Sequence, residues 1–100
     1  MLIAIDYDET YDQDFDLWEA FAHLAASRGH VVICVTCRTL PPGSVHKDER
    51  TPSFPVYCTT NQQKRPFMES LGIRVDVWID DFPESIASYA QSGGLLLPNR

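Results

Sequence analysis

Short apolar runs alternate along this chain with segments of helical spacing, and this alternation is what most limits how the chain can fold. The runs at 2–6, 31–35, 55–59 and 75–79 are bounded by polar residues, glycine or proline, as buried strands are. A further run at 95–97 predicts a short fifth strand. Strands that alternate with helices indicate a parallel sheet wrapped by helices. We therefore expect an α/β fold with three layers and about five strands.

The first helix is predicted between Asp14, whose side chain can cap the N-terminus, and Gly29, which ends the helix. Apolar residues recur there at helical spacing and are expected to form the buried stripe: Leu17, Trp18, Phe21, Ala22, Leu24 and Ala25.

Two further helices are expected, each with a proline near its start. Pro66 suits the first position of the second helix, which places Lys64 in the connection just ahead of it. Pro83 is expected to begin the third helix, which Gly93 and Gly94 close.

The bulk properties describe a single domain over residues 1–100. The apolar content of 44% is ordinary for a globular protein, and a net charge of −6 gives no overall attraction to nucleic acid. Five of the eight basic residues nevertheless fall between 38 and 65: Arg38, Lys47, Arg50, Lys64 and Arg65. This cluster favours a phosphate-bearing partner, and nucleic acid is compatible with it, although a solvated loop of mixed charge is the simpler interpretation.

The cysteines and the N-terminus favour a soluble protein of the cytoplasm. The three cysteines, Cys34, Cys37 and Cys58, are an odd number without a disulfide framework, which suits a reducing compartment. Cys34 and Cys37 form a C-x-x-C pair, but no second pair completes a zinc site, and Cys34 lies in an apolar run. We find no signal peptide and no span of membrane length, so no membrane association is expected.

Two carboxylates follow the first apolar run. Asp6 and Asp8 are two residues apart, a spacing that directs both side chains to one side of a strand. Like charges held together are unfavourable unless a positive group neutralises them, and Mg²⁺ prefers oxygen ligands. The pair therefore indicates a magnesium site, with a solvated acidic loop as the alternative.

Other polar residues fall at the ends of the later strands. Thr36 ends the second apolar run, Lys64 follows the third and Asp80 follows the fourth. Ligands of parallel α/β sheets bind at the carboxyl ends of the strands, near the point where the strand order reverses. We expect these residues to meet Asp6 and Asp8 at one edge of the sheet.

In this order the motifs resemble those of the haloacid dehalogenase superfamily of phosphohydrolases. The matching segments are Asp6-Tyr7-Asp8-Glu9-Thr10, the strand that ends in Thr36, Lys64, and Trp78-Ile79-Asp80-Asp81. The resemblance extends from residue 1 to about residue 92. It implies a Rossmann-like fold and a magnesium-dependent phosphatase.

The resemblance also implies a role for each residue. Asp6 would be the nucleophile that forms an aspartyl-phosphate, and Asp8 would protonate the leaving oxygen and then activate water. Thr36 would donate its hydroxyl to a phosphoryl oxygen, and Lys64 would neutralise charge on the same group. For Thr36 the alternative is a cap at the strand end, and for Lys64 an ordinary surface lysine.

Magnesium would lie between Asp6, the backbone carbonyl of Asp8 and Asp80. Asp81 would help through water or as a second ligand, or would instead cap the helix that follows it. Arg38 would grip a remote phosphate of the substrate, or would pair with Glu9.

The chain has no room for the cap domain that most relatives carry. The long loop at 39–53 follows the second strand, so it is not a standard cap, although it can act as a small lid. The expected protein is a magnesium-dependent phosphomonoesterase whose open site suits a bulky substrate, such as a nucleic-acid end or a phosphoprotein. The alternatives are a small-metabolite or nucleotide phosphatase covered by a partner subunit, and a non-catalytic module that binds metal or phosphate.

Overall fold

The computed structural model describes residues 1–88, and its centre is a parallel sheet of four strands in the order β3-β2-β1-β4. The strands are β1 (Leu2–Ile5), β2 (Val31–Thr36), β3 (Val56–Cys58) and β4 (Val77–Ile79). All three neighbouring pairs are parallel. The expected α/β class and parallel sheet are therefore confirmed, whereas the expected fifth strand at 95–97 lies outside the described residues.

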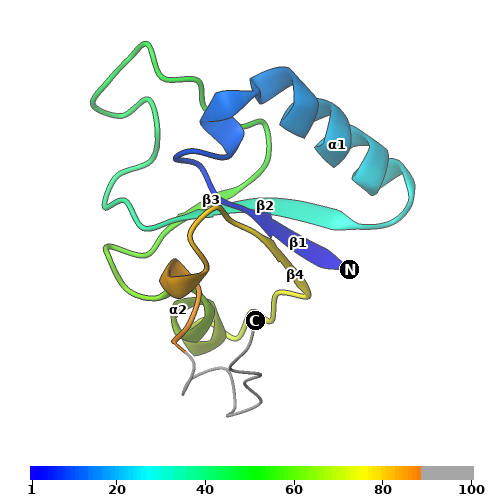
Figure 1. Cartoon of the computed structure of the whole chain (residues 1–100). Helices are drawn as coiled ribbons and strands as arrows, with labels where there is room; N and C mark the ends of the chain where they lie inside the picture. The colour runs from blue at the N-terminus through cyan, green and yellow to red at the C-terminus, as the bar shows by residue number, and fades with distance from the viewer. Residues whose placement is uncertain (89–100) are drawn as a thin grey trace.

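Two helices cover opposite faces of this sheet. Helix α1 (Phe15–Ser27) follows β1 through the short 3-10 helix η1 (Tyr11–Gln13), and α2 (Lys64–Ser70) connects β3 with β4. Figure 1 shows α1 above the sheet and α2 below it, which gives three layers. A second 3-10 helix, η2 (Pro83–Ser85), follows β4.

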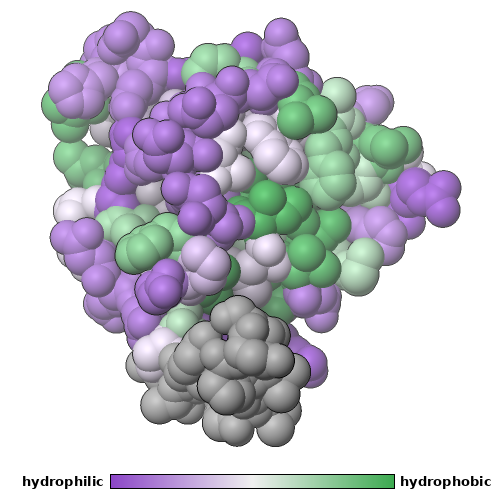
Figure 2. All heavy atoms as spheres, viewed as in Figure 1, coloured by the Kyte–Doolittle hydropathy of each residue, from purple (hydrophilic) through white to green (hydrophobic). Residues whose placement is uncertain are grey.

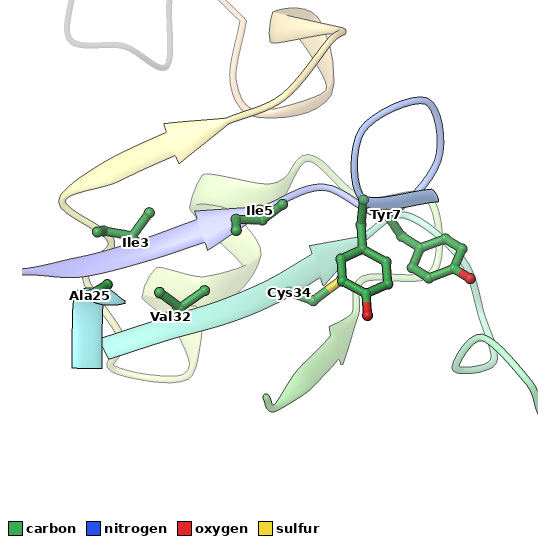
Figure 3. Packing of buried hydrophobic residues seen from close by; sticks show 7 residues of the cluster. Ile3, Ile5, Tyr7, Ala25, Val32 and Cys34 are labelled. Atoms are coloured by element: carbon green, nitrogen blue, oxygen red, sulfur yellow. The ribbon is translucent and has the colours of Figure 1, made fainter. Parts of the chain in front are cut away.

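The core consists of two clusters, one on each face of the sheet. Strand residues alternate between the faces because successive side chains of a strand point in opposite directions. The face toward α1 (Figure 3) collects Ile3, Ile5, Val32 and Cys34 with Ala25 of the helix. The face toward α2 collects Ala4, Ile33 and Val35 with Met68.

The predicted cap of α1 is confirmed, but its predicted buried stripe is partly wrong. The side chain of Asp14 accepts a hydrogen bond of 3.1 Å from the backbone N–H of Leu17. Leu17 and Leu24, however, are 53% and 59% exposed. The residues of α1 that belong to or pack against the core cluster include Phe21, and their stripe turns the two leucines outward: Phe15, Trp18, Phe21, Ala22 and Ala25.

The other two helices also differ from expectation. Helix α2 begins at Lys64, so Pro66 occupies its third position rather than its first. A proline is tolerated there because the first four N–H groups of a helix have no intrahelical partner. Pro83 does begin a helical turn, but the described part is a single 3-10 turn, and the expected closure at Gly93 lies outside the described residues.

An apolar surface lies between α1 and the β4 edge of the sheet. Hydrophobic residues gather on this face in Figure 2 and line a cavity of about 320 Å³ that includes Met1, Leu24 and Val77. Among the described residues, no helix is long and apolar enough to cross a membrane.

Candidate functional site

The candidate site lies at the carboxyl edge of the sheet, where the strand order reverses. The chain leaves β1 toward β2 on one side, and β4 later pairs on the other side. Asp6 follows β1 directly and Asp80 follows β4 directly. The backbone N–H of Asp6 donates to the carbonyl of Ile79 at 2.9 Å, so the two strand ends are held side by side. This is the position where parallel α/β sheets bind ligands.

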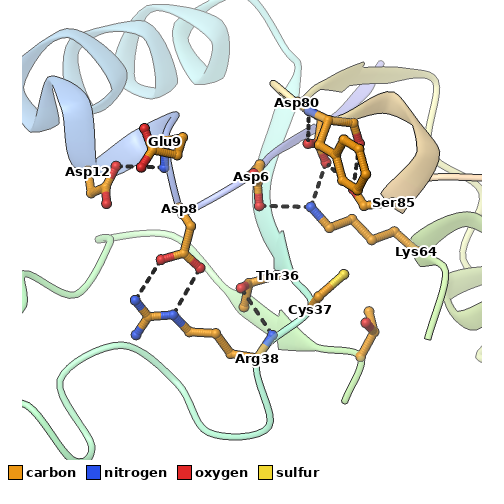
Figure 4. A network of polar contacts seen from close by, with 12 residues as sticks. Asp6, Asp8, Glu9, Asp12, Thr36, Cys37, Arg38, Lys64, Asp80 and Ser85 are labelled. Atoms are coloured by element: carbon orange, nitrogen blue, oxygen red, sulfur yellow. Dashed lines mark hydrogen bonds and ion pairs between the residues drawn. The ribbon is translucent and has the colours of Figure 1, made fainter. Parts of the chain in front are cut away.

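The side chain of Lys64 contacts the aspartates at both strand ends. Its ammonium Nζ donates to Oδ1 of Asp6 at 2.8 Å and to Oδ2 of Asp80 at 2.5 Å (Figure 4). Lys64 is only 1% exposed, although it is the first residue of α2. A lysine so deeply buried requires paired charges. The structure thus brings Lys64 to Asp6 and Asp80, and the alternative of an ordinary surface lysine is wrong.

Asp80 is held in place by three donors. Besides Lys64, it accepts the backbone N–H of Phe82 at 2.9 Å and the hydroxyl of Ser85 at 3.1 Å. The contact with Phe82 is the local turn that an aspartate makes with the residue two positions later. The hydrogen bond from Ser85 to Asp80 was not predicted from the sequence, although an aspartate followed by a turn that begins at a proline is a signal for a bond of this kind.

Three carboxylates are close enough to share one cation. Asp6, Asp80 and Asp81 each offer an oxygen, and these oxygens lie within 4.8 Å of one another. The N-cap position of η2 is Phe82 rather than Asp81, and the carboxylate that accepts the backbone N–H of Phe82 is that of Asp80. A set of carboxylate oxygens with one exposed member leaves room for water ligands, which is the coordination that Mg²⁺ prefers.

Burial and charge shift the pKa values of this cluster. Burial raises the pKa of the Asp6 carboxyl to about 7, even though the hydrogen bond and charge of Lys64 oppose the shift, and the charge of Asp80 adds to it. Burial alone would lower the pKa of the Lys64 ammonium, but the two carboxylates outweigh burial and leave that pKa raised. Lys64 therefore stays charged and compensates only part of the negative charge around it.

Asp8 does not join this cluster. Its carboxylate pairs with the Arg38 guanidinium through contacts of 2.7 and 3.1 Å, and Arg38 also makes two bonds to Glu49 at 2.7 and 2.8 Å. Figure 4 shows the Asp8 side chain directed to Arg38, away from Asp6 and Lys64. The hydrogen bonds from Arg38 lower the pKa of Glu49 to about 2. The partners of Arg38 among residues 1–88 are therefore Asp8 and Glu49, and the pairing with Glu9, one of the two alternatives for this residue, is not found there.

Thr36 is fully buried at the end of β2. Its Oγ1 accepts the backbone N–H of Arg38 at 3.3 Å, which is the strand-end capping contact considered as the alternative role. Neither Thr36 nor Arg38 is among the described residues that line the cavity over the carboxylates.

That cavity has a volume of about 530 Å³. Its lining includes the predicted residues Asp6, Asp8, Lys64, Asp80 and Asp81, and the rest of the lining was not predicted: Glu9, Cys37, Asn61, Gln62, Gln63, Phe82, Glu84 and Ser85. None of the described lining residues belongs to the 39–53 loop. This loop is instead held by two contacts, from Arg38 to Glu49 and from the hydroxyl of Tyr7, which donates to the carbonyl of Arg50 at 2.8 Å.

Comparison of the chain with protein-family models, with curated proteins and with solved structures finds no match.

The raised pKa of Asp6 predicts that Mg²⁺ binding depends on pH. Below a pKa of about 7 a proton occupies the Asp6 carboxyl and must leave before a cation can bind there. We expect the Mg²⁺ affinity to fall about tenfold for each pH unit below that value and to level off above it. Titration calorimetry between about pH 5.5 and 8 measures both the affinity and the released proton.

Asp16→Asn is the matched control, because Asp16 is an exposed carboxylate that pairs with Arg50 outside the cluster. This variant should keep the pH dependence, whereas Asp6→Asn should lose it. An affinity that stays constant across this pH range in the unmodified protein would contradict the assignment of Asp6 as a ligand.

Proposed function

We propose that the protein is a magnesium-dependent phosphomonoester hydrolase that works through an aspartyl-phosphate, in a fold like that of the haloacid dehalogenase superfamily. The observation that carries the proposal is that Asp6, Lys64 and the adjacent pair Asp80-Asp81, which come from three distant parts of the sequence, meet at one edge of the sheet. A nucleophile, a buried cation and a cluster of oxygen ligands are what phosphoryl transfer requires.

The reaction has two steps. An oxygen of Asp6 attacks phosphorus, the bond from phosphorus to the leaving oxygen breaks, and that oxygen takes a proton from Asp8. Water then loses a proton to Asp8 and attacks the same phosphorus, which releases inorganic phosphate and restores the Asp6 carboxylate. Lys64 offsets negative charge on Asp6 and on the phosphoryl group. When bound, Mg²⁺ would be held by Asp6, Asp80 and Asp81 and would supply further neutralisation of phosphoryl charge.

Asp8 must exchange its partner for this mechanism to operate. Its side chain lines the cavity and is half-exposed, so a rotation that leaves Arg38 brings its carboxyl toward a leaving oxygen. Arg38 would remain bound to Glu49 during this rotation.

A non-catalytic module that binds metal or phosphate is the second candidate. The pairing of Asp8 with Arg38 and the burial of Thr36 favour it, because Asp8 is bound to another partner and Thr36 does not line the cavity over Asp6. Such a module would bind Mg²⁺ and inorganic phosphate without turnover.

The absence of a described segment over the cavity favours a bulky substrate. No described segment covers the cavity, so a bulky phosphorylated substrate can reach Asp6, and a small metabolite or nucleotide would need a partner subunit as the cover.

Hydrolysis of 4-nitrophenyl phosphate tests the proposal directly. We expect turnover with Mg²⁺, a loss of at least about tenfold with a chelator, and full recovery when Mg²⁺ is restored. Turnover that is the same with and without the chelator would contradict a magnesium enzyme. Binding of Mg²⁺ and phosphate without any turnover would favour the non-catalytic module.

A further inference from the structure

We infer that this site takes phosphomonoesters whose leaving group is cationic, rather than the polyanionic ends of nucleic acids. The inference rests on the proposed function and adds the chemical class of the substrate. A basic phosphopeptide and a small phosphorylated amine share this chemistry, and matched pairs of substrates can separate them.

The charge at the mouth of the cavity is the first observation. The described lining residues include one cation, Lys64, which is buried and already bound by two carboxylates. Around it the lining carries six carboxylates: Asp6, Asp8, Glu9, Asp80, Asp81 and Glu84. A bound divalent cation would offset charge on the cluster of Asp6, Asp80 and Asp81, but not on Glu9 and Glu84. We call the exposed lining residues outside this cluster, which include Glu9, Phe82 and Glu84, the rim of the cavity.

Of the five basic residues in the sequence cluster, Lys64 alone is among the described residues that line the cavity. Arg38 is neutralised by Asp8 and Glu49, and Arg50 pairs with Asp16 at 3.3 Å. Lys47 and Arg65 are not among the described residues that line the cavity. The cluster of positive charge seen in the sequence therefore supplies no free cation to the described lining of the cavity, and the carboxylates there repel a second phosphate.

The aromatic side chain at the rim is the second observation, independent of the charge. Phe82 lines the cavity and is 58% exposed, between the carboxylates of Asp81 and Glu84 in the sequence. An ammonium or guanidinium group binds to an aromatic face as well as to carboxylates. The side chains of Asn61, Gln62 and Gln63 add uncharged donors and acceptors to the lining. A cationic organic leaving group finds complementary groups on this rim, whereas a nucleic-acid backbone finds like charge.

The experiment compares substrates that differ in the charge of the leaving group. One pair consists of phosphoserine peptides of equal length, flanked by lysines or by glutamates. A second pair consists of phosphoethanolamine and 3-phosphoglycerate, and the set is completed by a 3′-phosphorylated oligonucleotide and by 4-nitrophenyl phosphate as the uncharged reference. At low ionic strength we expect kcat/KM for the cationic member of at least one pair to exceed that of the anionic member by about tenfold or more. The difference should shrink as salt is added.

The pair that responds identifies the source of the cation. A preference for the lysine peptide alone indicates a protein substrate, and a preference for phosphoethanolamine as well indicates that the charge close to the ester is sufficient.

Variants connect the preference to the rim. Glu84→Lys should reduce the ratio of cationic to anionic substrate by about threefold or more, since it converts an exposed rim carboxylate into a cation. Glu69→Lys is the matched control, because Glu69 is an exposed carboxylate on α2 outside the cavity, and it should keep the ratio of the unmodified protein.

The failure of this inference differs from the failure of the proposed function. Turnover of 4-nitrophenyl phosphate together with equal or better rates on the oligonucleotide and the anionic members would overturn the substrate class alone. The absence of any Asp6-dependent turnover across the whole set would overturn both proposals.

Discussion

Replacement of Asp6 by asparagine is expected to lower kcat for 4-nitrophenyl phosphate by about 10³-fold or more, the scale seen when a covalent nucleophile is removed. The amide has no anionic oxygen to attack phosphorus, so no aspartyl-phosphate can form. The fold should tolerate this change. The amide introduced by Asp6→Asn keeps an oxygen that can accept the bond from Lys64, whose Nζ lies 2.8 Å from Oδ1 of Asp6, and Lys64 keeps its bond to Asp80.

Stability measurements make this result interpretable. Since burial already favours the neutral form of Asp6, the neutral amide should leave the denaturation midpoint equal to or above that of the unmodified protein at neutral pH. Asp16→Asn, which changes an exposed carboxylate outside the cavity, should keep the rate within about twofold. A folded Asp6→Asn variant that retains a tenth or more of the rate would show that another group is the nucleophile.

The sequence was sufficient for those parts of the fold that depend on local patterns. The four apolar runs became strands with most ends close to the prediction, because each run is short and bounded by polar residues, glycine or proline. Asp14 caps α1 through a bond to a residue three positions later, and such short-range capping can be read directly from the sequence. The meeting of Asp6 with Asp80 followed from a general property of parallel sheets, whose carboxyl ends share one edge.

The remaining features depend on distant pairs that no local pattern specifies. Arg38 lies 30 residues from Asp8 and 11 residues from Glu49. Several acidic residues could have been its partner, and only the path of the 39–53 loop determines which one is. The exposure of Leu17 is a similar case, because the helical periodicity allowed two neighbouring stripes and contact with the sheet selected one of them.

Lys64 is the residue on which the carboxylate cluster most depends for stability. Its side chain is 2% exposed, and it lies between Asp6 and Asp80, whose side chains are 10% and 2% exposed. Lys64→Met retains a stem of similar length but leaves these buried carboxylates without a cation. Loss of one partner from a buried ion pair typically costs about 3–5 kcal/mol. Since a domain of this size has a total unfolding free energy of about 5–15 kcal/mol, the variant should lose a large fraction of its stability in urea denaturation without metal.

The charge explanation predicts two conditions that restore stability to Lys64→Met. Mg²⁺ places positive charge among the same carboxylates, so it should raise the urea midpoint of the variant more than that of the unmodified protein. Lower pH should also help, and the sign follows from the direction of the pKa shift. Burial already raises the pKa of Asp6 to about 7, and removal of the ammonium raises it further. The folded variant therefore binds a proton more tightly than the unfolded chain does, and its stability should increase as the pH falls from about 7 toward about 4.

A matched control distinguishes the loss of a buried, paired ammonium from the loss of a lysine at an exposed position. Lys47 is exposed on the 39–53 loop and has no ion pair among residues 1–88, so Lys47→Met should change the unfolding free energy by less than about 0.5 kcal/mol. If Lys64→Met were as stable as the unmodified protein in metal-free buffer at neutral pH, the ammonium would not be compensating buried carboxylates. A variant that is destabilised but responds neither to Mg²⁺ nor to lower pH would point to lost packing instead. Only the combination of a large loss with recovery by both a cation and a proton supports the view that the chain brings its carboxylates together to hold a cation.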